Sequence, residues 1–236
     1  RQRQMCIRDR YKREAENEQL KYDKHVAYFH GCYVQYNYPQ LGKDMIKVLN
    51  ALGYGVILLE EEKCCGVAKI ANGLVKEATR DADINLRSIR KAVKHGVSAI
   101  LSTSSTCTFT IRDEYTHVLG IDARDVRDDV MLATRFIYSL IDEAGAKLAF
   151  RRDYHKRVAY HVPCHMERLG WAVYSMSLMR MIPGLDYVPL DPNCCGIAGT
   201  YGFKKENYDY SQAMGRPLFD EIERAGVDLV ATDCET

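Results

Sequence analysis

Cysteine is the residue type in this chain whose number and spacing point most directly to chemistry. The sequence holds nine cysteines among 236 residues. Thiolates are the preferred ligands of iron–sulfur clusters and of soft or borderline metal ions such as zinc. Apart from Cys6, the cysteines form two sets, each with a single cysteine, an adjacent pair followed by glycine, and a further single cysteine. We predict two metal centres, with ligands Cys32, Cys64, Cys65 and Cys107 in the first and Cys164, Cys194, Cys195 and Cys234 in the second.

The two cysteine sets agree in spacing and in their flanks, which indicates an internal repeat. The single cysteine precedes the pair by 32 positions in the first set and by 30 in the second. The tripeptide Val-Ala-Tyr precedes each single cysteine at the same offset. From the second cysteine of each pair, 39 positions lead to Ser104 in one copy and to Cys234 in the other. A repeat of this length implies two similar structural units, packed about a pseudo-twofold axis.

The adjacent pairs favour an iron–sulfur cluster over a single zinc ion. Local zinc ligands usually have two to four residues between them. Adjacent side chains diverge on an extended backbone, so a tight turn is needed to bring both sulfurs to one centre. Gly66 and Gly196 follow the pairs, permit positive φ and let backbone N–H groups approach the sulfurs. Four thiolates suffice for one [4Fe–4S] cluster, and a structural zinc site is the alternative.

Alternating strands and helices are predicted to position the cysteines. Short apolar runs predict strands at 26–29, 56–59 and 97–101, and again at 157–162, 187–190 and 227–231. Apolar residues at helical spacing predict helices at 41–52, 75–93, 169–182 and 218–225. We therefore expect an α/β fold of two repeated strand–helix units with mostly parallel sheets. Sites in such sheets gather where strands end, and every repeated cysteine follows a predicted strand.

The repeat also divides the chain into segments. A stretch with helical spacing at 128–141 is expected to pack one unit against the next, and the polar segment near residue 150 is the best boundary. We expect the first unit with its connecting helix at 24–150 and the second, truncated, at 151–236. The segment 1–23 begins with RQRQMCIRDR, which is expected to be non-native or disordered. Cys6 is therefore given no role.

Composition excludes several classes of partner. The 33 basic and 32 acidic side chains leave a net charge of +1, so there is no basic field for a nucleic acid. No apolar run approaches the roughly 20 residues that span a bilayer. No charged-then-apolar stretch typical of a secretory leader is present, and we expect a reducing compartment in which clustered cysteines bind metal or do redox work.

The twofold motif of Cys, a long gap, Cys-Cys-Gly, a long gap and Cys-x-x-Cys resembles the cysteine-rich CCG domain family. That family includes heterodisulfide reductase subunits and the iron–sulfur subunits of glycolate, lactate and glycerol-3-phosphate dehydrogenases. The chain is most similar to the anaerobic glycerol-3-phosphate dehydrogenase branch in YFHGC at 28–32, TSSTCT at 103–108, PCHME at 163–167 and CCGIAGTYGFKKENY at 194–208.

The resemblance implies an electron-transfer subunit of an oxidoreductase complex rather than the subunit that oxidises the substrate. A flavoprotein partner with bound FAD or FMN would oxidise glycerol 3-phosphate, and this chain would pass the electrons to the menaquinone or quinone pool. Its attachment would be peripheral, on the cytoplasmic face of the cell membrane. The alternatives are a heterodisulfide-type disulfide reductase, a subunit of a glycolate or lactate dehydrogenase, and a non-catalytic scaffold stabilised by zinc.

This sequence departs from the family pattern in three ways, which limit the family properties that can be expected of it. Ser104 stands where the first cysteine of Cys-x-x-Cys belongs, which argues against a five-cysteine, non-cubane centre in the first unit. The second cysteine of the other pair would fall just after Thr236, where the sequence stops. The closely spaced Cys-x-x-Cys runs of the ferredoxin-like part are absent, so we expect a fragment lacking that part and the extreme C-terminus.

Several residues near the cysteines could take part in the site, but an ordinary structural role is expected for each. His30 and His165 could ligate iron or donate a hydrogen bond to a cluster, but we expect each to be hydrogen-bonded near the surface. The acidic run at 60–63 is expected to be a solvated turn. The aromatic residues beside the cysteines could shield a cluster or line a quinone pocket. We expect instead that they pack as ordinary aromatic side chains; they are Tyr33, Tyr36, Tyr38, Tyr201 and Phe203.

Overall fold

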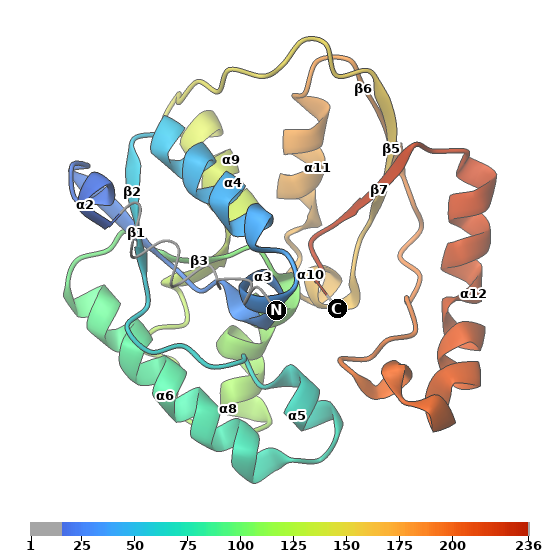
Figure 1. Cartoon of the computed structure of the whole chain (residues 1–236), viewed down its shortest axis with the longest axis horizontal. Helices are drawn as coiled ribbons and strands as arrows, with labels where there is room; N and C mark the ends of the chain where they lie inside the picture. The colour runs from blue at the N-terminus through green and yellow to red at the C-terminus, as the bar shows by residue number, and fades with distance from the viewer. Residues whose placement is uncertain (1–15, 236) are drawn as a thin grey trace, which may run out of the picture.

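The fold contains two parallel sheets, one in each repeat, in a computed structural model that describes residues 16–235. The first sheet has the order β2-β1-β3-β4, with β1 (Lys24–Tyr28), β2 (Tyr54–Leu58), β3 (Ile100–Ser102) and β4 (Val130–Leu132). The second has the order β6-β5-β7, with β5 (Lys156–His161), β6 (Leu185–Pro189) and β7 (Leu229–Thr232). The predicted α/β fold with parallel sheets is confirmed (Figure 1).

The two units share one topology. In each, the first strand lies in the centre, the second pairs on one side and the third pairs on the other. Val26 is paired with Val56 in the first sheet, and its counterpart Val158 is paired with Tyr187 in the second. The carboxyl ends of the three strands therefore meet along one edge in both units, which is where a site is expected in a parallel sheet.

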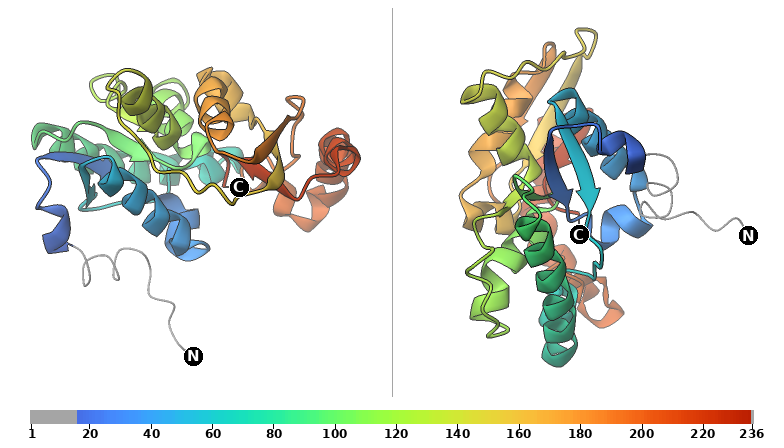
Figure 2. Two further views of the ribbon diagram at one scale, coloured as in Figure 1. Left: turned by 90° about the horizontal axis from the view of Figure 1, so that it is seen from above. Right: turned by 90° about the vertical axis from the view of Figure 1, so that its left-hand side faces the viewer.

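Helices cover both faces of the first sheet. Side chains of β1 alternate, so Val26 and Tyr28 pack in one apolar cluster, and Ala27 and Phe29 pack in the other. The first cluster lies under α4 (Pro39–Ala51) and α9 (Ala133–Asp142). The second lies under α6 (Val75–Lys94), α7 (Ser105–Phe109), the π-helical turn η1 (Thr110–Glu114) and α8 (Tyr115–His117). The two helical layers enclose the sheet (Figures 1 and 2).

The second unit repeats this arrangement on a smaller scale. Its sheet lies between α11 (Ala172–Arg180) and α12 (Tyr208–Ala225) (Figure 1). Ala159 of the central strand packs with Leu218 of α12 and with Leu190. Among the helices of residues 16–235, none combines the length and apolar character needed to span a membrane.

Short helices follow the strands and carry or flank the cysteines. A strand end leaves little room before the chain must turn, and one or two helical turns fit there. In the first unit these are α3 (Gly31–Tyr36) and α5 (Val67–Ala71), besides α7. In the second they are α10 (Cys164–Leu169), η2 (Tyr201–Phe203) and η3 (Lys205–Asn207).

The stretch predicted as one helix at 128–141 begins as a strand instead. Residues 130–132 form β4, which pairs with β3, and helix α9 starts at Ala133. Val130 and Leu132 are buried while Met131 between them is half-buried, so this alternation supports an edge strand. The part of the prediction that concerns packing between units is confirmed. Helix α9 lies against α11, where Ser175 Oγ donates to Thr134 Oγ1 at 2.8 Å.

The predicted segment 1–23 is described only from residue 16, so Cys6 lies outside the described residues. Residues 16–19 form the short helix α2 (Glu16–Gln19). Gln19 is buried, and its Oε1 accepts a hydrogen bond from Val56 N of β2 at 2.9 Å. This part of the segment is therefore joined to the first sheet. The boundary near residue 150 stays a prediction.

Candidate metal centre

The first cysteine set lines one cavity of about 560 Å³, formed by Cys32, Cys64, Cys65 and Cys107 with their neighbours. The Sγ atoms of Cys32 and Cys64 lie 4.0 Å apart. The Cys65 thiol forms hydrogen bonds with Cys107 and with Cys64. The structure therefore brings together four sulfurs that span 76 positions of the sequence, from 32 to 107.

The strand order explains this convergence. Cys32 lies in α3 after β1, the cysteine pair lies in the loop after β2, and Cys107 lies in α7 after β3. Because β1 is flanked by β2 and β3, the three connections leave the same edge of the sheet side by side. Each repeated cysteine follows a strand, as predicted.

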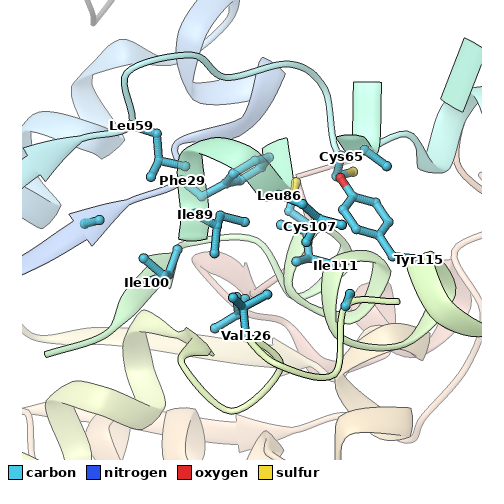
Figure 3. Close-up of a cluster of buried hydrophobic side chains, with 14 of the residues drawn as sticks. Phe29, Leu59, Cys65, Leu86, Ile89, Ile100, Cys107, Ile111, Tyr115 and Val126 are labelled. Atoms are coloured by element: carbon cyan, nitrogen blue, oxygen red, sulfur yellow. The ribbon is translucent and has the colours of Figure 1, made fainter. Parts of the chain in front are cut away.

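Burial divides the first set into an inner and an outer half. Cys65 and Cys107 are buried at the end of an apolar cluster, beside the ring of Tyr115 (Figure 3). Cys32 is exposed and Cys64 is half-buried. The inner sulfurs are therefore shielded from water, while the outer ones face the opening of the cavity.

Hydrogen bonds among these thiols shift their pKa values in opposite directions. The pKa of Cys64 is lowered, first by its hydrogen bond with the Cys32 thiol and second by its hydrogen bond with the Cys65 thiol. The same contact raises the pKa of Cys32, and hydrogen bonds to Cys107 and Cys64 raise the pKa of Cys65. Protons are thus shared within the set, and metal binding would release them.

The Cys-Cys-Gly turns have the predicted backbone geometry in both units. Gly66 has φ +103° and Gly196 has φ +83°, so both lie in the region that favours glycine. Gly196 N donates to Cys194 Sγ at 3.3 Å, and Gly66 N–H donates to Cys64. The approach of backbone N–H groups to the sulfurs, expected from the glycines, is confirmed. Such bonds set the reduction potential of a thiolate-bound cluster.

The second set lines a separate cavity of about 320 Å³, formed by Cys164, Cys194, Cys195 and Cys234 with neighbours that include His161 and His165. These cysteines follow β5, β6 and β7, as the first set follows its strands. Burial raises the pKa of the Cys195 thiol. Cys164 and Cys194 are exposed, so this cavity too has an open side.

The two cavities share a wall. Val67, Thr106 and Cys234 line both of them. Helix α5 of the first unit also contacts the loop after the second cysteine pair, where Asn72 Nδ2 donates to Thr200 Oγ1 at 2.9 Å. The two thiol sets are therefore neighbours across the junction of the units.

Ser104 has a structural role at the position where the repeat pattern places a cysteine. It is buried, and its Oγ accepts a hydrogen bond from Cys107 N at 3.2 Å, which caps α7. The serine thus helps to position Cys107 while lining the first cavity.

The donor chemistry of both cavities fits an iron–sulfur cluster. Each offers four sulfurs distributed around a space, together with a backbone N–H directed at one sulfur. Within residues 16–235, no group of three His, Cys, Asp or Glu side chains has the close spacing of a single-ion site.

Glu62 is a site residue that sequence reasoning missed. Its side chain is only 4% exposed, and it accepts hydrogen bonds from His30 N at 3.2 Å and Gly31 N at 2.8 Å. His30 Nδ1 lies 3.2 Å from Glu62 Oε1. The expectation of a solvated turn at 60–63 is therefore wrong for Glu62, which fixes the backbone just before Cys32. Nothing in the run of three glutamates distinguishes this one.

The histidines beside the single cysteines are hydrogen-bonded, as expected, but His30 is buried rather than near the surface. His165 Nδ1 lies 3.0 Å from Thr106 Oγ1, and its ring is stacked on Phe109 with centroids 5.1 Å apart. Burial lowers the pKa of His165. Both histidines therefore use Nδ1 for a contact within the protein.

The aromatic residues near the first cavity are less packed than expected. Tyr36 is 70% exposed and Phe203 is 67% exposed, yet both line the cavity. Tyr38 and Tyr201 are exposed as well, so the expectation of ordinary packing is wrong for all of these except Tyr33, and Tyr36 and Phe203 border the cavity instead of the core. Together with Cys32 they form the accessible side of the first centre.

A buried polar pair recurs where the central and third strands of each unit end. The Tyr160 hydroxyl donates to Asp233 Oδ2, and Tyr28 OH lies 3.1 Å from Thr103 Oγ1. Thr103 Oγ1 in turn donates to Glu235 Oε1 at 2.8 Å. Burial raises the pKa of Asp233, and it raises the pKa of Glu235 to about 7. These contacts hold the segment around Cys234 against both units, and no sequence motif signals them.

Comparison with known proteins agrees with the repeat. The family model described as a cysteine-rich domain, CCG, matches residues 26–112 and again 158–236. The first match covers β1 to β3 with the first cysteine set, and the second covers β5 to β7 with the second set.

The chain is similar to several curated proteins. It is 55% identical over 227 residues to one of the subunits of the anaerobic glycerol-3-phosphate dehydrogenase of Escherichia coli K12, which covers 96% of this chain and 57% of that relative. It is 30% identical to lactate utilization protein A of a Geobacillus species, covering 89% of this chain and 87% of the relative. It is 28% identical to one of the subunits of the dihydromethanophenazine:CoB–CoM heterodisulfide reductase of Methanosarcina barkeri, covering 89% and 51%. The chain thus spans little more than half the length of the first of these.

Proposed function

The chain belongs to the cysteine-rich CCG domain family, and we propose that it is the iron–sulfur electron-transfer subunit of an anaerobic glycerol-3-phosphate dehydrogenase. It takes electrons from a flavin-bearing subunit that oxidises glycerol 3-phosphate, and it delivers them to the menaquinone or quinone pool. It binds peripherally at the cytoplasmic face of the cell membrane. The observation that carries the proposal is the pair of thiol-lined cavities that share a wall.

The proposal assigns each cysteine set to one cluster of the [4Fe–4S] type. Cys32, Cys64, Cys65 and Cys107 hold the first, and Cys164, Cys194, Cys195 and Cys234 hold the second. A bound cluster supplies one-electron chemistry. The chain positions the sulfurs, excludes water from the inner ones and directs a glycine N–H at one sulfur of each set.

The two open sides suit an electron carrier with a partner on either side. Exposed Cys32 marks the accessible side of the first centre, and exposed Cys164 and Cys194 mark that of the second. The shared wall of Val67, Thr106 and Cys234 keeps the two centres next to each other. Electrons that enter on one side have a short internal route to the other.

Metal content of the anaerobically purified chain is the first test. We expect iron and acid-labile sulfide in equal amounts, at about eight of each per chain for two [4Fe–4S] clusters. Zinc without iron or sulfide would instead support the zinc-stabilised scaffold and contradict the proposal.

Activity of the whole complex is the second test. The full-length subunit with its partner dehydrogenase should reduce a soluble quinone analogue when glycerol 3-phosphate is supplied. Lactate and glycolate are the matched substrates, because a relative is named for lactate utilization. Reduction driven only by one of those acids would reassign the partner and leave the electron-transfer role in place.

A disulfide reductase is the second candidate. The exposed thiols Cys164 and Cys194 at the second cavity would be accessible to a disulfide, and one relative is named as part of a heterodisulfide reductase. Ser104 weighs against a five-cysteine centre in the first unit. Reduction of a thiol disulfide by the isolated reduced chain, without a dehydrogenase partner, would favour this candidate.

A further inference from the structure

Thr106 of the first unit stands between the two thiol sets. It is buried, and it lines both cavities. Its Oγ1 lies 3.5 Å from Cys234 Sγ and 3.0 Å from His165 Nδ1, both in the second unit. One hydroxyl therefore contacts a predicted sulfur ligand on one side and an imidazole on the other.

The direction of these hydrogen bonds follows from which of the three side chains can carry a proton. A metal-bound cysteine is a thiolate and can only accept, so the single Thr106 proton must point at Cys234. The oxygen of Thr106 is then left as an acceptor, and His165 Nδ1 must carry a proton and donate to it. With a cluster bound at Cys234, the three groups would therefore form a chain in which His165 donates to Thr106, and Thr106 donates to Cys234.

The surrounding contacts hold this chain in one geometry. The imidazole of His165 is stacked on the buried Phe109 ring with an interplanar angle of 20°, and Arg168 lies over the same ring at 5.6 Å from its centroid. Ser105 N donates to Asp233 O at 2.7 Å, which ties the start of α7 to the residue before Cys234. Donor and sulfur are therefore fixed from both units.

We propose that Thr106 is a positioning residue of the first unit that donates a hydrogen bond to the Cys234 sulfur and thereby raises the reduction potential of the second centre. A hydrogen bond to a ligand sulfur stabilises the more negative, reduced state of the centre. The first unit thus sets the potential of its neighbour, and electron flow from the first centre to the second becomes more favourable. This inference rests on the proposed electron-transfer function.

Thr106→Val removes the hydroxyl while keeping the shape of the side chain. Potentiometric titration of the anaerobically purified full chain, followed by electron paramagnetic resonance, measures both centres. The Cys32→Ser chain, altered at an exposed thiol of the first set, assigns the signals. Only the difference in hydrogen-bond strength between the two redox states shifts the potential, and we take that difference as about a tenfold change in the oxidised-to-reduced ratio. We expect the second centre of Thr106→Val to shift downward by about 59 mV for a one-electron couple, with the first centre unchanged.

Two further variants separate the hydroxyl from packing. Thr106→Ser keeps the donor and should retain the wild-type potential. Thr108→Val removes a buried hydroxyl of the same helix, which donates to Ser104 O at 2.8 Å, and should leave the potential of the second centre unchanged. If Thr106→Ser retains iron and Thr106→Val loses it, the donor role is also supported. Loss of iron in both Thr106 variants would overturn it.

The predicted chain of hydrogen bonds also predicts how a substitution at His165 changes the potential of the second centre. His165→Phe removes the Nδ1 donor and should shift the second potential in the same direction, and the double variant with Thr106→Val should shift no further than Thr106→Val alone. Equal potentials in wild type and Thr106→Val would overturn the inference. A wild-type chain without iron would overturn the proposed function and the inference with it, and metal content shows this before any potential is measured.

Discussion

At the scale of single residues, Glu62 shows how a side chain outside the cysteine sets can control a ligand. Its carboxylate accepts from two consecutive backbone N–H groups at His30 and Gly31, immediately before Cys32. Gly31 has φ +71°, and a Cβ there would lie 3.3 Å from Cys107 Sγ. The turn that delivers Cys32 is therefore tight, and the buried carboxylate keeps it in place.

Glu62→Gln should weaken the first centre. The amide keeps one acceptor, but its NH₂ group faces a backbone donor, so one hydrogen bond to a charged acceptor is lost at a cost of about 2 kcal/mol. Urea unfolding followed by circular dichroism measures the stability, and iron content measures the centre. Glu61→Gln is the matched control, because Glu61 is exposed, and it should change neither quantity. Equal effects of the two substitutions would contradict this role for Glu62.

Site residues could be predicted from the sequence only where their type and spacing form a recognisable pattern. The cysteines repeat at fixed spacing, and their chemistry is rare enough to stand out, so both sets could be predicted from sequence, and the members of each set line one cavity in the structure. Glu62, Thr106 and Asp233 act through hydrogen bonds to partners that are distant along the chain or set by the fold. Common polar residues of this kind leave no pattern in a single sequence.

At the scale of elements, the Cys-Cys-Gly turns are equal in backbone geometry but unequal in surroundings. A Cβ on Gly66 would meet Ala78 Cβ at 3.6 Å, an ordinary contact. A Cβ on Gly196 would lie 2.1 Å from Ser211 O, a backbone atom of α12. Both turns therefore face a helix, but the first leaves room for a Cβ beside α6 and the second leaves none beside α12.

Gly196→Ala should be more damaging than Gly66→Ala. Both substitutions place an L residue at positive φ, which costs about 1–2 kcal/mol. Gly196→Ala adds an overlap with backbone that can be relieved only by moving α12, at a further cost of about 1–3 kcal/mol. Thermal unfolding and iron content of the two variants check the order. A Gly66→Ala chain that is the less stable of the two would show that the surroundings of the turns do not decide the outcome.

Comparison of the predicted and observed elements shows which helices and strands can be predicted from the spacing of apolar residues. Each predicted strand is present, and the helices over 41–52 and 75–93 correspond to α4 and α6. Helices such as α3, α5 and α7 have five or six residues, too few for a 3.6-residue period to register. The strand β4 was missed because three residues before a helix merge with its apolar pattern.

Each unit should hold its centre independently of the other. Each cysteine set lines its own cavity, although Cys234 of the second set also borders the first, and Cys195 lines only the second cavity. Cys195→Ser should therefore remove iron from the second centre, about half of the total, and leave the first largely occupied. Cys64→Ser, at a half-buried thiol of the first pair, is the reciprocal variant. Equal loss of iron from both centres in either chain would show that they are not independent sites.

At the scale of the whole molecule, the two units are joined by polar contacts and by packing that includes Trp171. Trp171 is the sole tryptophan of the sequence and belongs to the second unit. The guanidinium carbons of Arg112 and Arg135 lie over its ring, at 4.9 and 4.2 Å from its centroid, and the ring packs with Leu132 of the first sheet. Separation of the units would expose this ring even if both sheets stayed intact.

The fluorescence of Trp171 should therefore report whether the units unfold together. Because the junction includes the buried Asp233, the bond from Ser105 N to Asp233 O and the pair Ser175–Thr134, we expect one cooperative transition. Urea midpoints from fluorescence and from circular dichroism should coincide. Ser175→Ala deletes the hydrogen bond to Thr134 and the contacts of Ser175 with Tyr160 and Asp233, and it should lower both midpoints together by the equivalent of about 1 kcal/mol for each bond lost. Val173→Ala, at an exposed position of α11, should lower neither. A fluorescence midpoint at lower urea than the circular dichroism midpoint would mean that the units separate before they unfold, and the shared wall between the centres would then open first.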